Sequence, residues 1–163
     1  MGKTSNAEWI VATRSADETR AVGEALGRAL RGGEIVLLVG QLGAGKTTLT
    51  QGLAVGLGID AYTKSPSFVL MNEYRGRVLL YHLDLFRIET PEEVWDLGIE
   101  EYIGEAGVIA VEWADRARAA FPEDAVEVEI KVTEEDRRRI AVRATGVPGV
   151  EAVARAETDW LGR

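Results

Sequence analysis

The chain contains no cysteine, which excludes disulfide bonds and thiolate metal sites and favours a reducing cytoplasm as its location. No apolar run approaches the ~20 residues that a membrane-spanning helix needs. The N-terminus has no apolar signal core, and Asn6 occupies the position at which a myristoylation pattern has Ser or Thr. We therefore expect a cytoplasmic protein without a membrane anchor.

Basic residues are fewer than acidic ones. The 19 Lys and Arg residues against 27 Asp and Glu residues give a formal net charge of −8. Because a free-standing nucleic-acid binder neutralises phosphates with Lys and Arg, we expect no DNA binding and no unaided RNA binding. An acidic excess also keeps a small protein in solution, which requires no partner.

The length of 163 residues, of which 46% are hydrophobic, is typical of one globular domain with an ordinary core. We expect that domain to span residues 1–145. Residues 146–163 form a C-terminal tail for which two alternatives remain. The tail is either a helix that docks through Val150, Val153 and Trp160 or an end that frays.

Short apolar runs and period-two alternation predict seven β-strands. We expect them over residues 8–13, 35–39, 67–74, 77–85, 107–113, 126–132 and 137–144. Helices are expected after the capping residue Ser15, after the glycines that follow the second strand, and over residues 90–97 and 114–120. This order predicts a three-layer α/β fold with a mixed, mostly parallel central sheet of about seven strands.

A glycine-rich segment joins the second strand to the second helix and matches the pattern G-x-x-x-x-G-K-[ST]. Glycines let the backbone turn its N–H groups toward phosphate oxygens, and the helix adds its positive N-terminal end. Lys46 is expected to bridge the β- and γ-phosphates, and the Thr47 hydroxyl to bind Mg²⁺. The phosphate-binding residues are predicted to be Gly40, Gly43, Ala44, Gly45, Lys46, Thr47 and Thr48. The fold expected is therefore that of a P-loop NTPase.

Two acidic residues end apolar strands, where they would lie near this loop. Glu112 ends "VIAVE" and Asp84 ends "LLYHLD". One of them would hold Mg²⁺ and the other would orient the attacking water, and the residues alone leave open which does which. His82, the only histidine, is expected to make a structural hydrogen bond beside Asp84.

Three further features have both a functional and an ordinary interpretation. The polar loop from Thr63 to Phe68 could contact the γ-phosphate or simply lead into a strand. Arg87 could stabilise transferred charge, although an exposed surface arginine is the commoner case. Trp113 could lie near the nucleotide, although filling the core is commoner.

Several nucleotide-dependent functions are compatible with a phosphate-binding loop. A GTPase is disfavoured because no N-K-x-D motif or D-x-x-G switch stands in a suitable place. A small-molecule kinase usually adds a lid and an acceptor pocket, for which this chain is short. A regulatory subunit that binds ATP without turnover remains open.

Taken together, the motifs resemble the bacterial TsaE (YjeE) family of small P-loop ATPases, which are needed to make threonylcarbamoyladenosine on tRNA. The matching segments are "GQLGAGKTT", "SPSFVLMNEY", "YHLDLFR", "LGIEEYI" and "VEW", in the family's order and spacing. Four residues differ mildly from the family's pattern, and none of these differences removes a group on which the expected chemistry depends. The four are Gln41, Ser67, Phe86 and Ala114.

This resemblance implies that the chain hydrolyses ATP slowly or not at all by itself and acts in a complex with TsaD and TsaB, which would activate it. The chain would contact tRNA only indirectly, through those partners. The resemblance also implies roles for individual residues. Lys46 and Asp84 would be catalytic, and Thr47 and Glu112 would hold Mg²⁺. The turns at Ser15 and at Asp136 would lie near the base.

Overall fold

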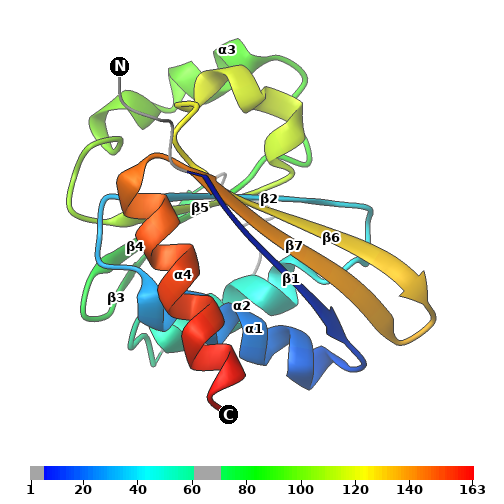
Figure 1. Cartoon of the computed structure of the whole chain (residues 1–163). Helices are drawn as coiled ribbons and strands as arrows, with labels where there is room; N and C mark the ends of the chain where they lie inside the picture. Colours follow the sequence, from blue (N-terminus) through cyan, green and yellow to red (C-terminus); the bar gives the residue numbers. More distant parts are fainter. Residues whose placement is uncertain (1–5, 61–70) are drawn as a thin grey trace.

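The computed structural model describes residues 6–60 and 71–163. A seven-stranded sheet lies between two layers of helices (Figure 1), in the strand order β1-β7-β6-β2-β5-β4-β3. The strands are β1 (Asn6–Thr13), β2 (Ile35–Gly40), β3 (Met71–Arg75), β4 (Leu79–Asp84), β5 (Val108–Glu112), β6 (Val126–Glu134) and β7 (Arg137–Thr145). The predicted three-layer α/β fold with a mixed sheet is confirmed.

The expectation of a mostly parallel sheet is too strong. Strand β2 pairs in parallel with β5 and β6, and β4 pairs in parallel with β5. The other three pairings, β1 with β7, β6 with β7 and β3 with β4, are antiparallel. Parallel pairing is therefore confined to the middle of the sheet, where β2 and β5 are apolar and covered on both faces.

One face of the sheet is covered by α1 (Ala16–Ala29), α2 (Lys46–Gly56) and α4 (Val147–Leu161) (Figure 1). The other face is covered by α3 (Pro91–Asp96) and the 3₁₀ helices η1 (Ile99–Glu101) and η2 (Ala114–Ala120). Each face has its own cluster of buried apolar side chains. In α4, Val153 is buried, and Val150 and Trp160 pack partly buried against the same core.

Helices α1 and α2 approach each other through glycines on both partners. A Cβ atom at Gly52 would lie 1.9 Å from the Arg20 carbonyl oxygen, and one at Gly23 would lie 2.0 Å from the Leu49 carbonyl oxygen. Gly27 and Gly56 leave equally little space. The two backbones are thus in direct contact, which fixes the position of α2 and of the loop that precedes it.

The segment over residues 114–120 is helical as predicted, but as a 3₁₀ helix with a non-helical Ala117 (φ −148°, ψ 40°). Its buried residues are Ala114, Ala117 and Ala120. Residues three apart lie directly above one another in a 3₁₀ helix, so the three buried alanines share the face that packs against the core. The 3₁₀ form differs from the α-helix that alanine favours.

The predicted helix caps and turns are largely present. Ser15 Oγ accepts from the Glu18 N–H at 3.1 Å and opens α1, and Thr90 and Glu93 form the capping box of α3. The first residues of the predicted strand over 67–74, and the loop from Thr63 to Phe68, lie outside the described residues. None of the described helices has the length and apolar character that crossing a membrane would require.

Candidate functional site

The glycine loop, residues 40–47, runs from the end of β2 to the first turn of α2. Gly43 and Gly45 have φ angles of 79° and 113°, a region that side chains other than glycine rarely adopt. At Gly40 the restriction is one of space, because a Cβ atom there would lie 2.8 Å from the Ile130 carbonyl oxygen. Each glycine of the motif is thus required by the backbone of the loop.

Lys46 extends its ammonium group back across this loop. Its Nζ atom donates to the carbonyl oxygens of Gly40 at 2.5 Å and Gln41 at 2.9 Å, and it lies 3.9 Å from the centroid of the Trp113 ring. Burial lowers the pKa of Lys46, while the carboxylates of Glu112, Asp115 and Asp84 act in the opposite direction. The lysine therefore stands as a partly desolvated cation that faces acidic groups.

Glu112 is buried and receives hydrogen bonds at both carboxylate oxygens. The Thr47 hydroxyl donates to Oε1 at 2.8 Å, and His82 Nε2 lies 2.6 Å from Oε2. The predicted structural bond of His82 therefore exists, but its partner is Glu112 on the neighbouring strand. His82 is fully buried, and its Nδ1 atom has no hydrogen-bond partner among the described residues.

Asp84 lies at the same edge of the sheet because β4 and β5 are parallel and in register. The Cα atom of Asp84 is paired with that of Glu112. Asp84 is half-buried, and its Oδ1 accepts from the Phe86 N–H at 2.9 Å. The two strand-end acids predicted from the sequence are thus brought together next to the loop.

Trp113 packs against the core and also lines the cavity next to the loop. It is the only described residue other than glycine with a positive φ, at 58°, and it lines the same cavity as the loop. The Phe86 ring lies 5.1 Å from it, centroid to centroid, and the Arg116 guanidinium lies 5.5 Å from both rings. Together these residues form an aromatic and cationic wall next to Lys46.

A cavity of about 310 Å³ joins these groups. It is lined by Leu42, Gly43, Gly45, Lys46, Thr47, Thr48, Asp84, Phe86, Glu112 and Trp113. Of the predicted loop residues, Gly40 and the buried Ala44 do not line the cavity. Arg87 is exposed and does not line it either.

Arg138 also contacts the glycine loop, although no sequence motif predicts this. This residue of β7 donates from Nε to the Ala44 carbonyl oxygen at 2.9 Å, and its Nη2 lies 3.5 Å from the Gly43 carbonyl oxygen. Its guanidinium therefore fixes the outer turn of the loop from the β6–β7 hairpin. Within "RRR" no local pattern distinguishes this arginine from its neighbours, because the contact joins residues 94 positions apart.

The oxygen groups at the site fit a Mg²⁺ ion shared with water and a bound phosphate. They do not fit a metal ion enclosed by protein side chains alone. Among residues 6–60 and 71–163, no group of three or more His, Cys, Asp or Glu side chains could enclose a metal ion. Thr47 and Glu112 instead offer neighbouring hydroxyl and carboxylate oxygens. Mg²⁺ is typically held by one or two such protein ligands together with water and substrate phosphates.

The chain is similar to known proteins over most of its length. Residues 13–140 match the family model described as "Threonylcarbamoyl adenosine biosynthesis protein TsaE". The chain is 40% identical over 130 residues to the tRNA threonylcarbamoyladenosine biosynthesis protein TsaE of Treponema pallidum, which covers 80% of this chain and 96% of that protein. It is also 40% identical over 135 residues to the TsaE protein of Bacillus subtilis, covering 82% and 84% of the two chains.

The fold has an equally extensive counterpart among solved structures. The crystal structure of Bacillus subtilis YdiB superimposes with a TM-score of 0.79 at 31% sequence identity, covering 98% of this chain and 99% of that one. The family match includes the glycine loop and both strand-end acids. The chain therefore belongs to the TsaE family of tRNA threonylcarbamoyladenosine biosynthesis proteins.

Proposed function

We propose that this chain binds ATP and Mg²⁺ at the glycine loop and hydrolyses ATP in support of threonylcarbamoyladenosine synthesis on tRNA. The main support is the convergence of Lys46, Thr47, Asp84 and Glu112 on one cavity at the ends of β2, β4 and β5. A strained glycine turn alone would need none of these four side chains.

Two kinds of positively charged group in the loop would bind phosphate. Backbone N–H groups of the loop and the N-terminus of α2 supply partial positive charge, and Lys46 supplies a full charge at the same cavity. A triphosphate would replace the carbonyl partners of Lys46 with charged oxygens, which form stronger hydrogen bonds. Loss of this lysine should therefore weaken ATP binding more than loss of any other single side chain of the loop.

Thr47 and Glu112 are the residues that would hold Mg²⁺, since their oxygens already lie 2.8 Å apart. When bound, Mg²⁺ neutralises charge on the phosphates. Asp84 is the better candidate for orienting the attacking water, because it lines the cavity only half-buried, whereas Glu112 is buried and already bonded to Thr47. We therefore propose Glu112 as the acid that holds the metal and Asp84 as the acid that orients the water.

The proposal includes the partners that family membership implies, TsaD and TsaB, and a cytoplasmic location. The net charge of −8 suits a subunit that docks on protein partners and contacts tRNA only through them. Slow hydrolysis by the chain alone and faster hydrolysis in the complex would follow if the partners complete the site.

The direct test is phosphate release from Mg-ATP by the purified chain, alone and with a TsaB and TsaD complex. We expect the partners to stimulate release and Lys46→Ala to abolish it. Arg139→Ala, which removes one exposed positive charge elsewhere, serves as the matched control. ATP binding without phosphate release under any condition would instead describe a regulatory subunit without turnover.

Asp84→Ala separates catalysis from binding. Removing the carboxylate should lower turnover by about 10²–10⁴-fold, the range typical of a general base, while leaving the affinity for Mg-ATP within about threefold of that of the unmodified chain. Calorimetric titration gives the affinity, and single-turnover hydrolysis gives the rate. Full support of tRNA modification by this variant would argue that hydrolysis is dispensable.

A further inference from the structure

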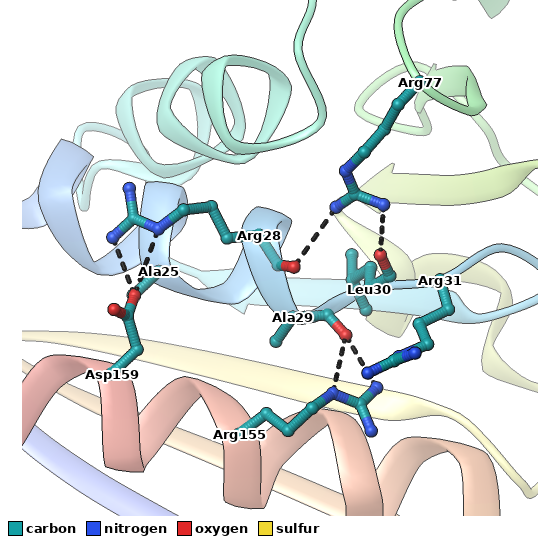
Figure 2. Close-up of a pocket in the computed structure, with 8 residues that line it drawn as sticks. All are labelled: Ala25, Arg28, Ala29, Leu30, Arg31, Arg77, Arg155 and Asp159. Atoms are coloured by element: carbon teal, nitrogen blue, oxygen red, sulfur yellow. Dashed lines mark hydrogen bonds and ion pairs between the residues drawn. The ribbon is translucent and has the colours of Figure 1, made fainter.

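A second cavity lies where α1 ends, at the opposite end of α1 and α2 from the glycine loop. It has a volume of about 540 Å³. Four arginines line it, Arg28, Arg31, Arg77 and Arg155, together with a single acidic residue, Asp159. Figure 2 shows these side chains approaching the end of α1 from three directions: from α1 itself, from the β3–β4 turn and from α4. Such a concentration of positive charge contrasts with the net charge of −8.

Two of these arginines are partly used in capping α1. Arg77 donates from Nη1 to the Leu30 carbonyl oxygen at 2.7 Å and from Nη2 to that of Gly27 at 2.6 Å. Arg155 donates from Nε and Nη2 to the Ala29 carbonyl oxygen at 3.2 Å and 2.7 Å (Figure 2). Cations at a helix C-terminus satisfy its free carbonyl groups, so this part of the cluster has a structural explanation.

Asp159 is paired with Arg28 at one side of the cavity. Its Oδ2 accepts from Arg28 Nη2 at 2.7 Å and from Arg28 Nε at 3.1 Å. Arg28 is also bound to Glu24 at 2.7 Å. The single charge of Arg28 is therefore shared by two carboxylates, and the excess of positive charge at the cavity comes from Arg31, Arg77 and Arg155.

Among the described residues, the side chain of Arg31 neither caps a helix nor pairs with a carboxylate. Its side chain is exposed and makes no hydrogen bond or ion pair with any residue in the described parts of the chain. Arg155 Nη1 is 3.9 Å from the nearest carboxylate, that of Glu151, which is too long for a hydrogen bond. Both guanidinium groups therefore have donors to spare at one cavity.

We propose that this arginine cavity is a second anion site, which binds a phosphate group through Arg31 and Arg155, with Arg77 adding charge. Guanidinium forks match phosphate oxygens in geometry as well as in charge. Helix α2, of 11 residues, begins at the glycine loop and ends near Arg77, which lies 3.5 Å from the Gly56 carbonyl oxygen. At 1.5 Å a residue the two sites are about 16 Å apart, too far for one phosphate to occupy both.

The phosphate can come from two sources, a small phosphorylated molecule or the backbone of an RNA. Inorganic pyrophosphate and a short single-stranded RNA oligonucleotide represent them. The titrations use the full chain carrying Lys46→Ala, so that the glycine loop does not dominate phosphate binding. The binding of these probes would stand even if the chain did not hydrolyse ATP, because an anion site at the arginine cavity does not depend on turnover.

Each probe is titrated by calorimetry into the Lys46→Ala chain, with and without Arg31→Ala. Arg31 has no partner to lose, so this variant should keep the fold and the melting temperature. We expect Arg31→Ala to weaken binding of at least one probe about tenfold, and the matched variant Arg139→Ala to change it less than twofold. Nitrogen-15 NMR should show the amide shifts at Leu30 and Arg31 and not at Gly43 or Gly45.

Binding of pyrophosphate alone would identify a small phosphorylated ligand. Binding of the RNA would identify its backbone, and would replace the view that tRNA is contacted only through partners. Binding of neither probe would overturn the proposal, as would equal affinities of the Arg31→Ala and Arg139→Ala chains.

Discussion

His82 shows how much one buried side chain adds to the site. It lies beneath Glu112, and its Nε2 is 2.6 Å from one carboxylate oxygen while Thr47 donates to the other. The carboxylate is thus held at both ends, and its direction is set before any ligand binds. Groups that orient a metal-binding side chain typically contribute 10–100-fold to metal affinity or activity.

We therefore expect His82→Ala to raise the Mg²⁺ concentration needed for half-maximal ATP binding by about tenfold. His82→Gln places an amide N–H where the imidazole Nε2 lies and should restore most of the Mg²⁺ affinity. Magnesium titrations at fixed ATP give the comparison. Equal Mg²⁺ requirements in the His82→Ala and unmodified chains would assign His82 to packing alone.

Lys46 should make nucleotide affinity sensitive to high pH. Burial lowers the pKa of this lysine, and the charged form is the one that binds phosphate. Affinity for ATP should therefore be full at neutral pH and begin to fall, as the pH rises, below the value of about 10.4 usual for an exposed lysine. Calorimetry over this range, with circular dichroism to verify folding, measures the effect. A Lys46→Ala chain should lack this dependence, and affinity that stays constant up to the ordinary value would contradict the prediction.

At the scale of elements, the contact between α1 and α2 leaves the least space for an added side chain among the described glycines. Gly52→Ala would place a methyl group 1.9 Å from the Arg20 carbonyl oxygen, so one helix must move. Overpacking of this kind costs about 1–3 kcal/mol, and we expect the melting temperature of this variant to fall by several degrees.

Gly162→Ala is the matched control, because its nearest contact would be an ordinary 3.5 Å at a negative φ of −83°. Thermal melts of the two variants give the comparison. A Gly52→Ala chain as stable as the unmodified one would show that the helices can separate at little cost. ATP titration of the same variant reports whether a shift of α2 also displaces the loop.

The predictable parts of this fold are those with local signals. The glycine loop, the apolar strand before it and the acids that end β4 and β5 are each recognisable within about ten residues of sequence. The pairing of His82 with Glu112 and the bond from Arg138 to the loop are not, because they depend on which strands are neighbours. The antiparallel pairing of β1 with β7 depends likewise on strand order, because it joins strands from opposite ends of the sequence.

At the scale of the whole molecule, α4 packs against elements from the N-terminal part of the sequence. Ala152, Val153 and Ala156 are buried against the core that α1 and the sheet share, and the Trp160 ring lies 6.0 Å from that of Trp9 in β1. Arg155 also caps α1. The helix is therefore part of the packed structure and joins elements from both ends of the sequence.

Removing residues 147–163 should lower the free energy of unfolding by about 3–5 kcal/mol, since it exposes apolar core surface and uncaps α1. Urea denaturation followed by circular dichroism measures the change. Deletion of Gly162 and Arg163 alone removes only exposed residues and should have little effect. An unchanged urea midpoint after the larger deletion would contradict this role for α4.

The strand order has a consequence for the synthesis of the chain on the ribosome. Among the described strands, β1 pairs with β7 alone, and β2 lies between β5 and β6. The first strands to emerge therefore have no partners in the sheet until most of residues 6–145 have been translated. The sheet can close only when β7 is complete. Until β5 and β6 have been made, the apolar residues of β2 lack their neighbours in the sheet and remain exposed to water or to a chaperone.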